Sequence, residues 1–274
     1  MKKILLAFDG TNFSEGAFEF ARRMNERSPI LLTAAFLPQI DYANVWSYAE
    51  ATAGPLFIPL SEEEDAVVVH KNIARFELLC QNNNIDYRVH KDFLDFAIPA
   101  LKKETRFADL LIIGSESFYE NLGINEPNEN LKDALHAAEC PILVVPEKFE
   151  YPKTNVLTYN GSNDSVYAIK QFAYLFPEFS KNETLLVYSK GETEMEIPDQ
   201  AYIEELAGRH FPNLTIMKLR LDPKKYFSSW MLDRKNAVLV SGAFSRSVFS
   251  QMFKKSFITD IITDHKLPVF IAHL

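Results

Sequence analysis

A turn that follows an apolar segment carries the residues with the clearest potential for chemistry. It reads GSESFYENLGINEPNENLKDAL from Gly114, comes after ADLLIIG and leads into a helical pattern. A strand, a turn and a helix start in this order often bind phosphate, because glycine lets backbone N–H groups reach the oxygens and the helix N-terminus adds partial positive charge. Here the turn has the frame of a phosphate site, but its lining is acidic: Glu116, Glu120, Glu126 and Glu129.

A second turn has the opposite charge. It reads SGAFSRSVFSQMFKKSF from Ser241 and contains Arg246, Lys254 and Lys255 but no acid. Basic side chains can bind a phosphate or an anionic lipid head group. A solvated basic turn beside a helix start is the alternative interpretation.

The sequence contains no evident catalytic set. Its six histidines do not form HExxH, and there is neither a GxSxG elbow nor a Walker A loop. The two cysteines, Cys80 and Cys140, form no CxxC pair, so we expect no metal site, no disulfide framework and a reducing cytoplasm. The residue types favour a protein that binds over an enzyme.

The overall composition limits the partners. The 274 residues carry a formal net charge of −8, and 47% of them are hydrophobic. This acidic balance argues against nonspecific binding to nucleic acid or to an anionic membrane. No apolar run approaches the length of a membrane span, about 20 residues, and the N-terminal run ends at Asp9, too early for a signal peptide. We therefore expect a cytoplasmic globular protein.

Strand and helix patterns alternate in the first half of the chain and position the acidic turn. The helix SEGAFEFARRMNE has Ser14 as its expected N-cap, and SEEEDAVVVHKNIARFELLCQNNN opens on a capping-box pattern of Ser61 with Glu64. Two further helical patterns are FAIPALKKETRF and LKDALHAAE. The segments that read as strands are KKILLAF, ILLTAAFL, IDYRVHK, DLLIIG and PILVV. This order predicts a doubly wound parallel sheet.

The pattern then starts again after a polar segment. TNVLTYNGSNDSVYAIKQFAYLF echoes KKILLAFDGTNFSEGAFEFARRM, with a strand, a glycine-containing turn and an amphipathic helix. The ends of the halves also correspond, because ADLLIIGSESF leads to AAECPILVVPE just as NAVLVSGAFSR leads to DHKLPVFIAHL. The sequence thus predicts two copies of one unit.

KKILLAFDG, DLLIIGS, CPILVVPE and the internal repeat resemble the universal stress protein family in its tandem form. The resemblance implies an α/β fold of two flavodoxin-like (adenine nucleotide alpha hydrolase-like) units, each a five-stranded parallel sheet with helices on both faces. It also implies that the units pack as a pseudo-twofold dimer through their last strands, PILVV and PVFIA. The expected boundaries are residues 1–147 and 154–274, with a linker at 148–153.

Many members of this family bind ATP, and the resemblance therefore implies a ligand site in each half. An Asp after the first strand holds the ribose, and a loop of the form G-x2-G-x9-G-[ST] wraps the phosphates. The second glycine position holds Ser117 in the first half, and the final pair there is Pro127-Asn128. Each half has lost a different part of the pattern. The residues at the pattern's positions, and hence the expected ligand contacts, are Asp9, Gly10, Thr11, Ala34, Gly114, Asn160, Gly242, Ser245, Lys255 and Ser256; of these, Asn160, Ser245 and Lys255 replace the Asp and the glycines of the pattern.

The segment 41–60, DYANVWSYAEATAGPLFIPL, is rich in aromatic residues: Tyr42, Trp46, Tyr48 and Phe57. Long loops are often contact surfaces or lids, and Trp and Tyr are favoured in interfaces. We expect this insert to cover the core or to contact a second copy or another protein partner. A lid over the Asp9 cleft is the alternative.

The resemblance implies a tandem universal stress protein, a cytoplasmic stress-response protein that acts by binding and whose nucleotide sites are degraded. Two alternatives remain open at this point. One is an ATP-binding stress protein, with magnesium, that has weak ATPase activity. The other is a protein that binds another small anionic ligand.

Overall fold

The strands of the chain form one mostly parallel sheet. The structure is a computed structural model that describes residues 1–9, 11–37, 63–91, 97–116, 118, 129–189, 196–219, 230–231, 234, 236–242, 262 and 267–273. Within this part, ten strands follow the order β3-β2-β1-β4-β5-β10-β9-β6-β7-β8. The strands of the first half are β1 (Lys2–Phe8), β2 (Ile30–Phe36), β3 (Asp86–Lys91), β4 (Leu110–Gly114) and β5 (Ile142–Val145). Those of the second half are β6 (Thr154–Tyr159), β7 (Glu183–Ser189), β8 (Leu214–Leu219), β9 (Ala237–Ser241) and β10 (Val269–Ile271).

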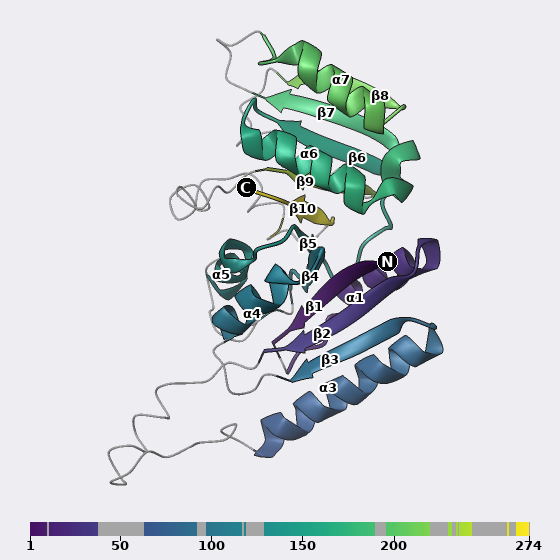
Figure 1. The fold of residues 1–274 in the computed structure, drawn as a ribbon, viewed down its shortest axis with the longest axis vertical. Helices are drawn as coiled ribbons and strands as arrows, with labels where there is room; N and C mark the ends of the chain where they lie inside the picture. Colours follow the sequence, from purple (N-terminus) through teal and green to yellow (C-terminus); the bar gives the residue numbers. More distant parts are fainter. Residues whose placement is uncertain are drawn as a thin grey trace, which may run out of the picture.

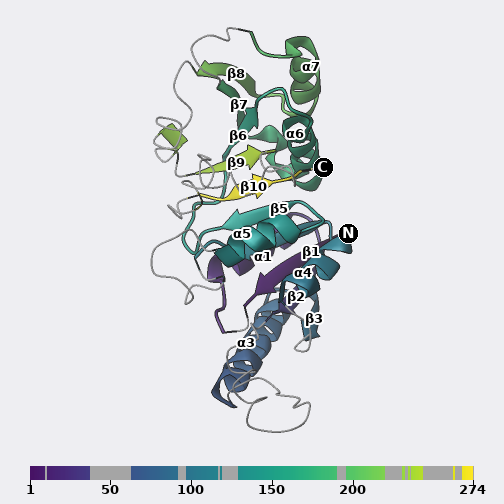
Figure 2. The same ribbon diagram turned by 90° about the vertical axis from the view of Figure 1, so that its left-hand side faces the viewer.

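Helices lie on both faces of this sheet (Figures 1 and 2). One core joins the sheet to α1 (Glu15–Arg27), α3 (Glu63–Asn82), α6 (Asn163–Leu175) and α7 (Gln200–His210). The other core joins it to α4 (Ala97–Arg106) and α5 (Glu129–Ala137). The division follows the alternation of side chains along each strand, because Leu6 and Phe8 of β1 enter the first core while Leu5 and Ala7 enter the second.

The two halves of the sheet meet at β5 and β10. These strands are antiparallel, with Val269 opposite Val144 and Ile271 opposite Ile142, whereas every other strand pair in the described part of the chain is parallel. The expected pairing of the two last strands is therefore confirmed. The outcome is a single continuous ten-stranded sheet where the resemblance implied two five-stranded sheets, because the β5–β10 hydrogen bonds join the halves edge to edge.

Aromatic side chains join the halves on the α1 and α6 face. The ring of Phe20 in α1 lies 5.4 Å from that of Tyr151, 6.2 Å from that of Phe176 and 6.4 Å from that of Phe179. Phe176 and Phe179 belong to the second half, where Phe179 lies in a 3₁₀ helix, η2 (Pro177–Lys181). The segment after β5 is thus packed onto α1, and the two halves share one core on this face.

The start of α1 is as expected, because Ser14 is the N-cap and its Oγ accepts a hydrogen bond from the N–H of Ala17. The predicted capping box at Ser61 lies outside the described residues, as does the aromatic insert at 41–60. Among the described residues, no helix is long and apolar enough to cross a membrane.

Candidate functional site

The strand register relates the site residues of the two halves. Leu143 and Phe270 face each other in the β5–β10 pair, and their parallel neighbours are Ile112 and Val240. Gly114 lies two residues after Ile112 in the chain, and Gly242 lies two residues after Val240. The next strands add Leu6 opposite Ile112 and Leu157 opposite Val240. Asp9 lies three residues after Leu6, and Asn160 lies three residues after Leu157. The correspondences read from the sequence therefore agree with the register of the sheet.

Each half brings its two positions together at the carboxyl ends of neighbouring strands. Asp9 follows β1 and Gly114 ends β4, and these strands pair. Asn160 follows β6 and Gly242 follows β9, and these strands pair as well. Because the halves meet in an antiparallel pair, the strands of the two halves run in opposite directions. The carboxyl ends of the first-half strands, and with them the first candidate site, therefore lie at the opposite end of the strands from the second candidate site.

Hydrogen bonds from its own loop occupy the carboxylate of Asp9. Its Oδ1 accepts from the N–H of Thr11 at 3.0 Å and from that of Asn12 at 2.7 Å, and its Oδ2 accepts from Asn12 Nδ2 at 2.8 Å. Asn72 of α3 donates to the carbonyl oxygen of Thr11 at 2.9 Å and holds this loop from the side. Asp9 is 5% exposed and its Oδ1 already accepts two backbone N–H groups, so this carboxylate is largely engaged by its own loop.

The first glycine of each loop is explained by the close packing of a helix. A Cβ on Gly114 would lie 2.6 Å from Ser14 Oγ, at the N-cap of α1. A Cβ on Gly242 would lie 2.0 Å from the carbonyl oxygen of Asp164 and 2.3 Å from the backbone nitrogen of Ser165, in the first turn of α6. Both positions admit only glycine because the helix start touches the strand end, whatever ligand is present.

A carboxylate of the chain itself lies at the N-terminus of α1. Oε2 of Glu147 accepts a hydrogen bond from the N–H of Gly16 at 3.0 Å, beside the Ser14 cap. Gly16 permits this approach, because a Cβ there would lie 2.1 Å from the carbonyl oxygen of Pro146. The N–H of Glu147 in turn donates to Oε2 of Glu116 at 2.9 Å.

The contact between Glu116 and Glu147 gives one acid of the first turn, Glu116, a structural role. The positive end of a helix dipole and its unpaired N–H groups favour an anion, and charge-assisted bonds of this kind are among the stronger ones. Glu147 supplies that anion at α1, and Glu116 fixes the backbone that carries Glu147. The acids Glu120 and Glu126 lie outside the described residues, and only the backbone of Glu129, the first residue of α5, is described.

The second half differs at the corresponding turn. Asn160 is exposed, and its Oδ1 accepts from the N–H of Ser162 at 2.9 Å. Gly161 has a positive φ of 82°, a conformation that favours glycine. Ser162 caps α6 two residues after Asn160, whereas Ser14 caps α1 five residues after Asp9. This turn is therefore shorter than its counterpart and has no segment equivalent to Thr11–Phe13.

The other predicted positions divide into two groups. Thr11 is exposed and donates to Asp9, while Ala34 is fully buried in β2 beside Leu6 and contributes to the core. The remaining four lie outside the described residues: Gly10, Ser245, Lys255 and Ser256.

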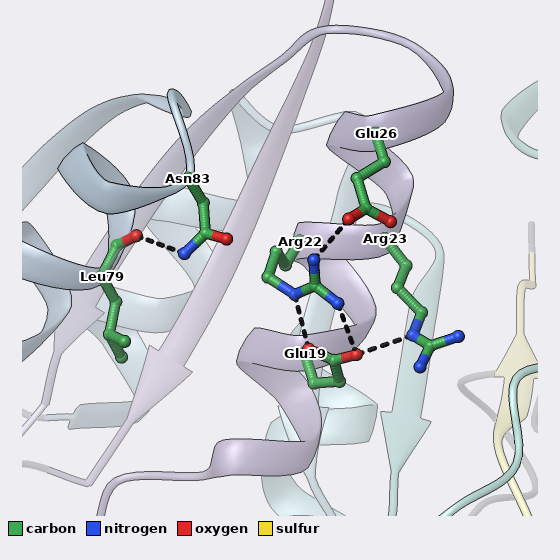
Figure 3. Close-up of polar contacts among 6 residues, drawn as sticks. All are labelled: Glu19, Arg22, Arg23, Glu26, Leu79 and Asn83. Carbon is green, nitrogen blue, oxygen red and sulfur yellow. Dashed lines mark hydrogen bonds and ion pairs between the residues drawn. The ribbon is translucent and has the colours of Figure 1, made fainter.

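A surface hollow of about 520 Å³ lies beside the α1 N-terminus, between α1, the end of α3 and residues 147–149. Arg22 binds Glu19 through two nitrogens and also binds Glu26, as Figure 3 shows. Of the other lining carboxylates, Glu15 pairs with Arg75 and Glu147 accepts the N–H of Gly16. The hydrogen bond from Arg22 holds the pKa of Glu19 below its usual value. Because the carboxylates that line this hollow already have partners within the protein, we assign no ligand to it.

Glu147 is the site residue that sequence reasoning missed. In the sequence it stands at the end of the expected first unit, next to the linker, and no local pattern connects it to Gly16, which is 131 residues away. The nearest signal was the glycine at position 16, which is unusual in the first turn of a helix and marks a close approach of backbone.

Comparisons with known proteins bear on the fold. No protein-family model matches the sequence, and no curated protein matches it. A universal stress protein from Archaeoglobus fulgidus is similar in structure, with a TM-score of 0.71 over 99% of this chain and 96% of that chain, at 14% identity. MurG of Acinetobacter baumannii aligns with a TM-score of only 0.19 at 9% identity, over 97% of this chain and 93% of that chain, which is too low to indicate a shared fold. The chain thus has the fold of a universal stress protein.

Proposed function

We propose that this protein is a tandem universal stress protein that acts by binding and does not use a nucleoside triphosphate in its first half. In this interpretation, residues 1–147 and 154–274 are two units joined by the linker 148–153, and they pack as a pseudo-twofold dimer. It is a stress-response protein of the cytoplasm, and its surface binds protein partners.

One observation carries the proposal: the carboxylates of Glu147 and Glu116 already accept backbone N–H groups beside the first-half turn. A phosphate that approached this turn would meet these negative charges. Two like charges about 4 Å apart repel by roughly 4 kcal/mol at an effective dielectric constant of 20, before screening. The satisfied and buried carboxylate of Asp9 supports the same conclusion for the ribose position.

The test is thermal unfolding with and without millimolar Mg-ATP, together with a direct binding titration. A ligand at 100 times its Kd adds about 2.7 kcal/mol to the free energy of unfolding, which raises the Tm by several degrees. We expect no rise in the full chain.

Two variants identify the site if a rise does occur. Each is compared with its own ligand-free sample, because Asp9→Asn also changes the stability of the loop. A rise that is lost in Asp9→Asn contradicts the proposal for the first half. A rise that survives in Asp9→Asn but is lost in Asn160→Ala assigns nucleotide binding to the second half, and the protein is then an ATP-dependent binder.

A further inference from the structure

We propose that residues 196–199 form a strap that closes the carboxyl end of β6 and β7, and that the hydrogen bond between Tyr159 and Pro198 holds this strap shut. The open strap is the state in which the hydroxyl of Tyr159, which is 3% exposed in the closed state, becomes free to bind a ligand beside the exposed Asn160. This inference concerns the second half and does not depend on the function proposed above.

Contacts at the end of β6 define the closed strap. Oη of Tyr159 donates to the carbonyl oxygen of Pro198 at 2.9 Å. The ring of Pro198 lies where a side chain on residue 161 would be, since a Cβ on Gly161 would be 2.9 Å from both Cβ and Cγ of Pro198. Ile197 is 4% exposed and belongs to the core beneath. The strap is therefore seated on the turn that carries Asn160.

At the strap, the second half has two tyrosines where the first half has two phenylalanines. In the first half, Phe8 and Phe36 are paired on neighbouring strands and their rings stack at 5.1 Å. By the strand register, Tyr159 and Tyr188 are the corresponding pair in the second half. Each Tyr adds one hydroxyl at the carboxyl end of the sheet. The hydroxyl of Tyr159 is the one that holds Pro198.

The buried hydroxyl of Tyr188, next to Tyr159, destabilises this end of the sheet in the closed state. Tyr188 is 2% exposed, and its Oη has no hydrogen-bond partner among the residues that the structure describes. A buried hydroxyl without a partner loses its hydration and receives nothing in exchange. Tyr188 lies beside Tyr159 in the β6–β7 register, so an opening at this end of the sheet that lets water reach its hydroxyl would reduce this cost.

Asp199 adds a second cost to the closed state. Its φ of 50° lies in the left-handed region, which a non-glycine residue adopts at some expense. It also begins α7 without a side-chain cap hydrogen bond. The closed strap thus combines one hydrogen bond and apolar contacts with local strain, which is the balance of a segment that opens below the free energy of global unfolding.

Hydrogen exchange of the full chain, followed by mass spectrometry, tests the proposal with a matched pair of variants. Tyr159→Phe removes the hydroxyl that binds Pro198, and Tyr188→Phe makes the same change on the neighbouring strand where the hydroxyl has no described partner. In Tyr159→Phe we expect the protected amides within residues 197–203, those of Tyr202 and Ile203 that bond to the carbonyl oxygen of Asp199, to exchange about fivefold faster, the factor for the loss of one hydrogen bond of ordinary net strength. In Tyr188→Phe we expect these amides to exchange at the wild-type rate or more slowly.

Three results would overturn the proposal. Unchanged exchange of residues 197–203 in Tyr159→Phe would mean that the hydrogen bond does not hold the strap. An equal increase along the whole chain would mean that the strap opens only with the rest of the protein. An equal increase in Tyr188→Phe would mean that the aromatic packing, and not the Pro198 bond, controls this segment.

Discussion

Oε2 of Glu147 and the backbone nitrogen of Gly16 lie 3.0 Å apart, joined by a hydrogen bond between residues 131 positions apart in the chain. The bond places a negative charge of the protein itself at the positive end of α1. It also ties the end of the first half to the first helix, directly before the chain passes into the second half.

Removal of this carboxylate should destabilise the protein. We expect Glu147→Ala to lower the free energy of unfolding by about 1–2 kcal/mol, because a charge-assisted bond and a favourable charge at the helix N-terminus are both lost. Urea denaturation measures the change. Glu150→Ala, an exposed Glu of the same segment, is the matched control and should alter the free energy by less than about 0.5 kcal/mol. Equal values for the two variants would show that the Gly16 contact contributes no stability.

Two glycines should respond to alanine in opposite directions. Gly242→Ala places a Cβ 2.0 Å from a backbone oxygen of Asp164 and should cost about 1–3 kcal/mol or more. Gly208→Ala lies within α7, where a Cβ meets no atom within 4 Å, and should stabilise by about 0.5–1 kcal/mol through helix propensity. Thermal and urea unfolding of both variants measure the difference. A loss in Gly208→Ala that matched the loss in Gly242→Ala would refute the packing explanation.

Phe20 should be among the most sensitive core positions. It is fully buried and contacts aromatic rings of the linker and of the second half, so Phe20→Ala should lower the free energy of unfolding by about 3–5 kcal/mol. Phe107→Ala is the control, because that ring is 65% exposed. If the halves unfolded independently, Phe20→Ala would produce two separate transitions instead of one that shifts as a whole.

The two thiols should make the protein less stable at alkaline pH. Burial raises the pKa of both Cys80 and Cys140 to about 12. An unfolded thiol ionises at about pH 8.5. Above that value the unfolded state binds fewer protons than the folded state, so the free energy of unfolding falls as the pH rises toward 12, by up to about 1.4 kcal/mol per pH unit for each thiol.

Urea titrations from pH 7 to pH 10.5 should show this decline. Cys80→Ala and Cys140→Ala should each flatten part of it. Variants that keep the full wild-type slope would contradict the assignment. Below pH 8 the thiols should add no pH dependence to the free energy of unfolding, because they are protonated in both states.

Much of the architecture could be predicted from the sequence because it follows from local patterns. The apolar runs at β1, β4 and β5, the helical spacing of α1 and the Ser14 cap each occupy a few neighbouring residues, and all were expected. The internal repeat identified the correspondence of Asp9 with Asn160, and the strand register agrees with it. The family resemblance supplied the pairing of the two last strands and pointed to the universal stress protein fold.

The state of the candidate site could be predicted only in part. The residue types at positions 9 and 114 indicate a ligand site. They do not reveal that Asp9 already accepts hydrogen bonds from Thr11 and Asn12, or that position 114 has no room for a side chain beside Ser14. A residue type states which bonds are available, whereas the folded chain decides which of them are already made.

The sequence by itself determined the alternation of strands and helices, the duplication and the acidic character of the first turn. The tertiary structure alone decided that Glu147 reaches Gly16 and that Pro198 rests on Gly161, because each pair is distant in sequence and meets only when the sheet brings the ends of its strands beside the starts of its helices. Local sequence patterns are governed by bonds between near neighbours, and contacts of this kind are governed by the packing of the whole chain.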